Sequence, residues 1–494
     1  MLHSIFICAI ILLIGEKMQR LLACKKSGGY GMEKILNEMV DKAFTALVKD
    51  TQEIMRIKSV LDESTIGNGA PFGEGIAEAL ETMLTKAGGM GLVTKNLEGY
   101  AGYAQLGETG EQVGVLAHLD VVPADGDDWL FPPYSAQIAE GKLYGRGSID
   151  DKGPAVACLY ALKAIKDSGL PISKCARLIL GTDEESFSRG IKYYLQKEEA
   201  PVCGFSPDAQ FPIIHAEKGI LHFSYRLKLT EPVSNIISLK AGNRINVIPG
   251  AAEALVTGIA QEVVRAQIKA LGLEEHFTAT LVGKDLKIIS MGITGHASMP
   301  EAGYNAIQNL LQLMAVILPG EDCGSQFIKY WAEHLQMETN GVSLGIGCQD
   351  EISGALTINT ATIKLDAKEI MLQFDIRYPV TYEGEKLLVK LEALAEKLGA
   401  EFTVIQHAAS LYVEKACPFI KVLQETYKAC TGEEPELLAI GGGTYCRSVK
   451  NTVSFGPVFP GQQELAHQSN EYIALEDLCK ITKIYAQAIY NLIR

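Results

Sequence analysis

The amino-acid sequence predicts an α/β fold, in which a mostly parallel sheet has helices on both faces, with an inserted α+β domain. Three observations support this prediction. Apolar runs of strand length alternate with a helical pattern between residues 113 and 182. Residues 216–409 change to alternating strands with two or three helices, and residues 410–494 return to helix and buried strand. Apolar strands separated by helices are typical of a parallel sheet covered on both faces.

The first predicted element is an amphipathic helix that begins at Met32, because apolar residues recur there at helical spacing. The preceding segment differs. Ile5–Ile14 is an apolar run shorter than the roughly 20 residues of a membrane span. Its positive charges follow the run, whereas a signal peptide carries them in front. We therefore expect residues 1–31 to be a non-native start or a disordered extension.

A strand, a helix and a second strand are predicted next. VGVLAHLDVV (113–122) is expected to form a buried strand, and ARLILGT (176–182) another. Between them, GPAVACLYALKAIKDSG (153–169) has the pattern of a helix, with Pro154 in its first turn and Gly169 as its stop.

The changes of pattern also predict the domains. One domain would be built from two segments, residues 32–215 and 410–494. Residues 216–409 would form a separate lid domain inserted between them.

The composition excludes several classes of partner. The chain has 494 residues and a formal net charge of −14, which would repel nucleic acid and anionic membrane surfaces. A small molecule or peptide is the expected ligand. The 11 cysteines are scattered, without a CxxC pair, so they indicate neither a disulfide framework nor a structural zinc cluster. Free thiols favour a cytoplasmic location.

Polar residues gather where the predicted strands end, and ligands of such sheets bind at the carboxyl ends of the strands. A set of two imidazoles and three carboxylates suits zinc or a similar divalent ion. These candidate ligands are His118, Asp150, Glu185, Asp208 and His467. Five ligands are too many for one tetrahedral site, so two ions that share a carboxylate would fit, with a hydroxide bridging them.

The stretch GTDEES (181–186) fits such a site. Successive side chains diverge, so Glu185 would be a ligand while Glu184 faces the bridging water as the general base. Asp120 lies two residues after His118 and would accept the imidazole N–H. Each residue also has an ordinary structural interpretation: a buried core histidine, a helix N-cap at Asp150, a turn at Asp208 and a surface His467.

Five motifs together resemble the dizinc metallopeptidase family of aminoacylase, acetylornithine deacetylase and glutamate carboxypeptidase. They are HLDVVP (118–123), YGRGSIDDKGP (144–154), GTDEES (181–186), SPDAQFP (206–212) and ELAHQSNEYI (464–473). The strings DDKGP, GTDEES, GGGTY and HQxNE (467–471) are similar to those of its bacterial dipeptidase branch, the peptidase V or Xaa-His dipeptidase type. The resemblance covers residues 32–494.

The resemblance implies a role for each candidate ligand. His118 and Asp208 would hold one zinc ion, Glu185 and His467 the other, and Asp150 would bridge them. Glu184 would be the general base and Asp120 the orienter of His118. In the lid domain, the matching positions for substrate binding are His296 and Asn246 as oxyanion donors, Arg377 as a carboxylate clamp, and Gly442 and Gly443 as backbone lining.

The sequence therefore predicts a metal-dependent dipeptidase that acts on short unblocked peptides and binds two divalent ions. Zinc is expected, and manganese or cobalt would suit the same ligands. Two alternatives stay open: a deacylase of N-acyl amino acids from the same family, and a metal-binding protein without catalysis. We expect a monomer with neither a nucleic-acid nor a membrane partner. Cys446, within GGGTYCR, has no assigned role.

Overall fold

The structure is a computed structural model that describes residues 29–494, apart from residues 125, 127 and 319. Most of the extension predicted for residues 1–31 therefore lies outside the described residues. The first described helix, α2, begins at Gly29, three residues before the predicted start at Met32. In the described part of the chain, no helix combines the length and the apolar character needed to cross a membrane.

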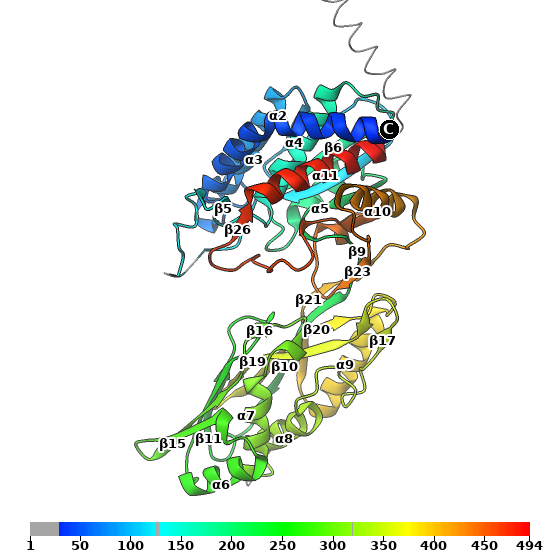
Figure 1. Ribbon diagram of the computed structural model, residues 1–494. Helices are drawn as coiled ribbons and strands as arrows, with labels where there is room; N and C mark the ends of the chain where they lie inside the picture. Colours follow the sequence, from blue (N-terminus) through cyan, green and yellow to red (C-terminus); the bar gives the residue numbers. More distant parts are fainter. Residues whose placement is uncertain (1–28, 125, 127, 319) are drawn as a thin grey trace, which may run out of the picture. The chain divides into compact units, whose positions relative to one another are not determined.

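The chain divides into two compact units (Figure 1). Unit 1 comprises the described residues up to His215, together with Val413–Leu438 and Thr444–Arg494. Unit 2 comprises Ala216–Tyr412 and the short segment Ala439–Gly443. The chain thus leaves unit 1 after His215 and returns to it at Val413.

Unit 1 is built on a sheet whose centre is parallel. Strand β3 lies between β6 and β7, β7 lies beside β24, and all three pairings are parallel. Antiparallel strands flank this centre, with β2 and β1 beyond β6, and β9 and β22 beyond β24. The strands of this sheet are β1 (Val93–Leu97), β2 (Ala101–Leu106), β3 (Gln112–His118), β6 (Cys175–Gly181), β7 (Cys203–Ser206), β9 (Ile213–Glu217), β22 (Leu411–Tyr412), β23 (Leu437–Ile440) and β24 (Thr452–Ser454).

Helices cover both faces of this sheet. Helices α4 and α11 pack against β3 and β6, and α2 packs on α4 and α11 (Figure 1). Side chains alternate along a strand, so Leu116 and Ile179 point to the other face, where they pack with α5 and the turn η4. The helical segments are α2 (Gly29–Arg56), η1 (Glu63–Thr65), α3 (Glu74–Gly89), α4 (Lys152–Ser168), α5 (Arg189–Lys197), α10 (Pro418–Thr431), η4 (Tyr445–Ser448) and α11 (Leu475–Ile493).

Short strands organise the loops at the carboxyl ends of the parallel strands. Strand β5 pairs with both β4 and β26, and β8 pairs with β25. These strands are β4 (Gln137–Ala139), β5 (Lys142–Tyr144), β8 (Ala209–Gln210), β25 (Pro457–Val458) and β26 (Tyr472–Ala474).

Two predicted boundaries in unit 1 can be compared directly. Helix α4 ends where it was predicted to end, because Gly169 takes the left-handed conformation (φ 65°) and caps it. Strand β3 stops at His118, four residues before the predicted end at 122. The backbone turns away there, since Val121 donates a hydrogen bond to the Ser59 carbonyl of a different segment.

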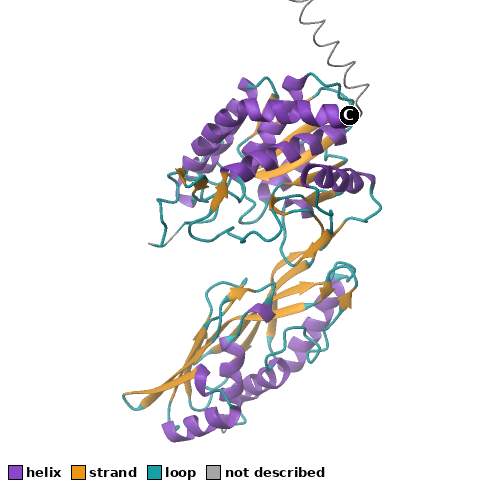
Figure 2. Ribbon diagram, in the orientation of Figure 1, coloured by secondary structure: helices purple, strands orange, loops and turns teal. Residues whose placement is uncertain are grey.

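Unit 2 is an antiparallel eight-stranded sheet with helices along one face (Figure 2). Its order is β14-β15-β13-β11-β19-β20-β10-β21. The strands of the unit are β10 (Gly219–Lys228), β11 (Ile236–Ala241), β12 (Val247–Ile248), β13 (Ala251–Val256), β14 (Phe277–Val282), β15 (Asp285–Met291), β16 (Gly295–His296), β17 (Gln349–Asp350), β18 (Gly354–Ala355), β19 (Thr357–Leu365), β20 (Glu369–Tyr378) and β21 (Glu401–Ala408).

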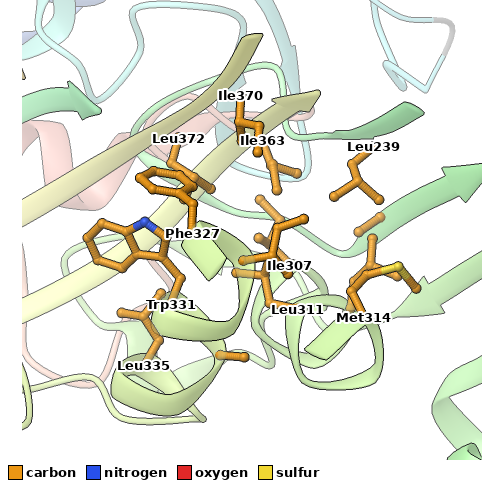
Figure 3. Packing of buried hydrophobic residues seen from close by; sticks show 14 of the residues in the cluster. Leu239, Ile307, Leu311, Met314, Phe327, Trp331, Leu335, Ile363, Ile370 and Leu372 are labelled. Carbon is orange, nitrogen blue, oxygen red and sulfur yellow. The ribbon is translucent and has the colours of Figure 1, made fainter. Parts of the chain in front are cut away.

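The helices of unit 2 close over a large apolar core (Figure 3). Ile307, Leu311 and Met314 of α7 and Trp331 of α8 point toward strand residues such as Leu372. All five side chains are at most 1% exposed, so the core resembles that of an independent domain. The helical segments are α6 (Gln261–Leu271), η2 (Glu274–His276), η3 (Pro300–Ala302), α7 (Ala306–Ile317), α8 (Cys323–Leu335) and α9 (Gly384–Leu398).

Candidate active site

The carboxylate of Asp150 lies between two imidazoles. Its Oδ1 is 3.0 Å from Nε2 of His118, and its Oδ2 is 3.0 Å from Nε2 of His467. On the first side, Oδ2 of Asp208 is 3.6 Å from the same His118 nitrogen. On the second side, the two oxygens of Glu185 lie 3.1 and 3.0 Å from Nε2 of His467. The five candidate ligands therefore gather into two groups that share Asp150.

The parallel strands explain how residues so far apart in sequence meet. His118 is the last residue of β3, Glu185 follows the end of β6, and Asp208 lies between β7 and β8. These strands are adjacent and parallel, so their carboxyl ends lie at one edge of the sheet. Asp150 lies two residues before the first residue of α4, and His467 lies in the loop between β25 and β26.

Asp120 holds the turn that carries the two glutamates. Its two carboxylate oxygens each accept a backbone N–H, one from Glu184 and one from Glu185, both at 3.1 Å. Nδ1 of His118 is 2.9 Å from the backbone carbonyl oxygen of Asp120 and 3.5 Å from its carboxylate. Asp120 thus contacts His118 chiefly through its backbone, while its side chain fixes the position of the glutamates.

Glu184 points to the group formed by His118 and Asp208. One ligand-type atom of each of these three residues lies within 4.8 Å of the other two. The neighbouring Asp183 has a different partner: the guanidinium of Arg189 donates to the Asp183 carboxylate at 2.8 and 2.9 Å. Of the three consecutive acidic residues, only Glu184 and Glu185 therefore take part in the cluster.

The electrostatics of the cluster show an excess of buried negative charge. Burial raises the pKa of Glu184 well above its usual range and that of Glu185 to about 7, and the charge of Asp150 adds to the second shift. Burial and Asp150 also raise the pKa of Asp208 to about 6. Carboxylates that raise one another's pKa in a buried site are stabilised by a cation placed between them.

The pKa values of the two imidazoles are also raised, whereas that of Asp150 is lowered. Burial disfavours the charged imidazole, but the surrounding carboxylates outweigh it and raise the pKa of His118 well above its usual range and that of His467 to about 11. The same contacts hold the pKa of Asp150 below its usual range despite its burial. The imidazoles thus supply positive charge to a site rich in carboxylates.

The donor set fits divalent metal ions. Nε2 of His118 and Oδ1 of Asp150 are buried and face each other at 3.0 Å, yet neither makes a hydrogen bond within the described part of the chain. Buried polar atoms of native proteins nearly always have a partner. Imidazole nitrogens and carboxylate oxygens that converge in this way form a ligand set for zinc, manganese or cobalt.

In unit 2, the predicted oxyanion donors Asn246 and His296 are neighbours. Strands β12 and β16 pair Val247 with His296, and the Asn246 carbonyl accepts a hydrogen bond from the Ala297 N–H at 2.9 Å. The His296 side chain is exposed, and its Nδ1 lies 2.7 Å from the hydroxyl of Ser298. Two residues that are 50 positions apart in sequence are thus held on one two-stranded ribbon.

Arg377, the predicted carboxylate clamp, is already bonded on three sides. Its guanidinium forms a two-pronged ion pair with Asp375 at 2.6 and 2.8 Å, and Nη1 donates to the Gly441 carbonyl at 2.8 Å. Asp375 is buried and also contacts Nε2 of His222 at 3.1 Å. Three of the five N–H groups of Arg377 are therefore engaged, and they connect β20 to the segment that contains Gly442 and Gly443.

Several supporting residues were not recognised in the sequence. Asp151 occupies the N-cap position of α4, yet its side chain accepts the backbone N–H of His118 at 3.0 Å instead of capping the helix. The Lys152 ammonium is buried and donates to the Ile57 carbonyl at 2.6 Å. The Ser59 hydroxyl donates to the Leu119 carbonyl at 2.6 Å. Asp151 and Lys152 lie within the motif YGRGSIDDKGP (144–154), but the sequence analysis gave neither of them a role.

Comparisons with known proteins agree with the motifs. The model of a family described as peptidase family M20/M25/M40 matches residues 114–491. A Bacillus subtilis (strain 168) protein named "Putative dipeptidase YtjP" is 42% identical over 456 residues, covering 90% of this chain and 97% of that protein. A Staphylococcus aureus (strain USA300) relative, "Putative dipeptidase SAUSA300_1697", is 33% identical over 464 residues, covering 92% of this chain and 98% of its own length.

Two solved structures share the fold. Human carnosine dipeptidase 1 has a TM-score of 0.55 at 15% identity, covering 93% of this chain and 99% of that chain. The dipeptidase Dug1p from Saccharomyces cerevisiae has a TM-score of 0.56 at 14% identity, covering 93% and 98%. The predicted fold class and the resemblance drawn from five motifs are confirmed. This chain belongs to peptidase family M20/M25/M40 and is a metallopeptidase.

Proposed function

We propose that this protein is a dipeptidase that hydrolyses short, unblocked peptides with two divalent metal ions. The observation that carries the proposal is the position of Asp150, whose two oxygens each lie 3.0 Å from a different imidazole. A carboxylate between two groups of nitrogen and oxygen ligands is the geometry that a pair of ions requires. The dipeptidase names of two relatives that match nearly the whole chain support the substrate class.

The residues present divide naturally between the two ions. His118 and Asp208 would hold one ion, His467 and Glu185 would hold the other, and Asp150 would bridge them. Zinc is the ion we expect, with manganese or cobalt as substitutes. When bound, such ions polarise the scissile carbonyl and activate a water molecule for attack.

Glu184 would carry the proton in this reaction. Its carboxylate belongs to the cluster with His118 and Asp208 but is not required as a ligand by the division above. It would accept the proton of the attacking water and deliver it to the nitrogen of the leaving amine. Asp120 would keep Glu184 in place through the hydrogen bond to its backbone N–H.

Unit 2 would supply the groups that bind the rest of the substrate. His296 and Asn246 would donate to the oxygen that becomes negatively charged, and Arg377 would bind the terminal carboxylate. Gly442 and Gly443 would line the substrate through their backbone. We further propose that unit 2 acts as the lid, that the chain works as a monomer, and that it works in the cytoplasm.

The test compares two sets of substrates. The protein is stripped of metal, restored with zinc or manganese, and assayed on free dipeptides and on the same dipeptides with an acetylated N-terminus. We expect cleavage of the free dipeptides only, and only with metal. Preference for the acetylated set would make the protein a deacylase. Two bound ions without cleavage of either set would make it a metal-binding protein without catalysis.

A further inference from the structure

A buried ion pair joins the two loops that hold Asp150 and His467. We call residues 145–151 the Asp150 loop and residues 459–471 the His467 loop; they lie between β5 and α4, and between β25 and β26. Nη1 of Arg146 and Oε2 of Glu471 are 2.7 Å apart, and their side chains are 4% and 0% exposed. Each partner belongs to a different loop.

Glu471 holds the Asp150 loop by several bonds. Its Oε1 accepts the backbone N–H of Ile149 at 2.9 Å and lies 3.4 Å from the N–H of Asp150 itself. The Ser148 hydroxyl donates to the same oxygen at 3.3 Å. One carboxylate from the His467 loop therefore fixes three consecutive residues that end at Asp150.

Arg146 holds the His467 loop in return. Its Nη2 donates to the His467 carbonyl at 3.4 Å and its Nη1 to the Gln468 carbonyl at 3.3 Å. His467 has a left-handed backbone (φ 64°), which is unfavourable for residues other than glycine. The guanidinium thus binds the carbonyls of a turn that would otherwise tend to relax.

The distance from Asp150 to His467 depends on these contacts, because the two residues belong to loops that are 317 positions apart in the sequence. The paired strands β5 and β26 align the start of one loop with the end of the other, since Tyr144 pairs with Tyr472. Beyond that pairing, the backbone of each loop bonds to the charged side chain of the other.

We propose that Arg146 and Glu471 are positioning residues, which set the separation of Asp150 and His467 and thereby the affinity for the metal pair. This inference rests on the proposed function. Neither side chain is needed as a ligand; each acts through the loop that it binds. Partners that orient metal ligands in this way commonly contribute a factor of about 10–100 in metal affinity.

A second, partly buried ion pair of unit 1 provides the control. Arg177 and Glu198 lie 3.0 Å apart with side chains 11% and 12% exposed, and Arg177 also bonds Gln105 and Tyr194. None of these four residues is a candidate ligand. Glu198 also contacts Nζ of Lys95 at 2.6 Å, so Glu198→Gln weakens two ion pairs of the same unit without touching either loop.

The experiment measures zinc binding and unfolding for the wild type and for Glu471→Gln, Arg146→Lys and Glu198→Gln. Zinc affinity is taken from competition with a chromophoric chelator, and the cobalt-substituted forms give an absorption spectrum that reports ligand geometry. We expect Glu471→Gln and Arg146→Lys to bind zinc about tenfold more weakly or worse, with altered cobalt spectra. Glu198→Gln should destabilise the metal-free protein yet bind zinc as the wild type does.

Arg146→Lys keeps a positive charge beside Glu471, so it serves as the test if Glu471→Gln does not fold. Lysine cannot span the carbonyls of both His467 and Gln468, and weaker zinc binding is therefore still expected. A smaller loss of zinc affinity than stated, or an equal loss in Glu198→Gln, would overturn the inference. A wild-type protein that binds no zinc would overturn the proposed function, and this inference with it.

Discussion

Among single residues, three consecutive acidic side chains have different partners and therefore different roles. Asp183, Glu184 and Glu185 follow one another, but Asp183 is bound by Arg189 while the other two face the cluster. Of these three residues, Asp120 binds only the two glutamates, because its carboxylate accepts a hydrogen bond from the backbone N–H of Glu184 and from that of Glu185. Position on the turn, and not residue type, therefore decides which acidic group is available as a base.

Replacement of Glu184 tests this division. Glu184→Ala should lower turnover by a factor of about 10²–10⁴, since a general base contributes that much. Its metal content should stay at that of the wild type, because Glu184 is not a proposed ligand. Steady-state kinetics and elemental analysis of the purified variant measure both. Full activity in Glu184→Ala would remove the proposed mechanism.

Replacement of Arg377 tests the carboxylate clamp. Arg377→Ala would leave the carboxylate of Asp375 buried without its main partner, at a cost of about 3–5 kcal/mol in stability. Arg377→Lys keeps the charge but loses the fork, so it is the better probe. We expect it to raise KM for a free dipeptide far more than for the C-terminal amide. Equal changes for both substrates would argue against the clamp.

The order of elements places His118, Glu185 and Asp208 together because they lie at or just after the ends of adjacent parallel strands, whereas Asp150 and His467 lie in loops and were selected through the motifs. Their partners could not be predicted in the same way. Arg146 and Glu471 are 325 positions apart, and nothing local marks either residue as half of an ion pair. Two bonds of Arg377 go to Asp375, two residues earlier on the same strand, whereas its bond to the Gly441 carbonyl depends on the path of a distant segment and was not foreseeable.

At the scale of elements, the start of α4 is fitted tightly against the Asp150 loop. A Cβ added to Gly153 would lie 2.2 Å from the Ser148 carbonyl oxygen. The Gly153 N–H donates to the Gly147 carbonyl at 3.0 Å, which ties the start of α4 to the same loop. Glycine at this position is therefore part of what places Asp150.

The close packing around Gly153 predicts that two Gly→Ala substitutions in helices change the stability in opposite directions. Gly153→Ala should destabilise the protein by about 1–3 kcal/mol and weaken metal binding, because it pushes on the Asp150 loop. Gly89→Ala, at the exposed end of α3 where a Cβ would meet nothing within 4 Å, should stabilise the protein by up to about 1 kcal/mol. Denaturant unfolding measures both. Weaker metal binding in Gly89→Ala, or unchanged binding in Gly153→Ala, would contradict this account.

The end of strand β3 could not be predicted from the apolar pattern of the sequence. The run VGVLAHLDVV reads as one strand, because its apolar residues continue past His118. In the structure those later residues are buried as a loop, since Leu119 and Val121 bond to the backbone of Gly181 and Ser59. Burial of a loop beside a site and burial in a strand give the same apolar pattern.

At the scale of the whole molecule, every proposed metal ligand lies in unit 1, and each unit has its own core. A ligand that binds only the folded state stabilises that state, by about 2.7 kcal/mol at a hundred times its dissociation constant. Metal should therefore raise the stability of unit 1 and leave that of unit 2 nearly unchanged.

The two tryptophans allow this to be measured, because Trp129 lies in unit 1 and Trp331 in unit 2. Trp331→Phe leaves a fluorescence signal from unit 1 alone, and Trp129→Phe leaves one from unit 2. Added zinc should raise the unfolding midpoint of the first signal and not of the second. Equal shifts of both would mean that the two units unfold as one.

The change of sequence pattern near residues 216 and 409 suggested the inserted domain; the two compact units change over after His215 and at Val413. No sequence pattern predicted that Ala439–Gly443 would belong to unit 2. Those five residues are assigned by their contacts, among them the bond from Arg377 to Gly441, which no local pattern reveals.

If two metal ions share Asp150, the metal content of three proteins must differ in a defined order. The wild type, His467→Ala and Asp150→Asn are purified identically, equilibrated with zinc and analysed for zinc per chain. We expect two ions in the wild type, one in His467→Ala, and a larger loss in Asp150→Asn, because both ions would lose a ligand. Retention of both ions in Asp150→Asn, or a loss no greater than in His467→Ala, would contradict it.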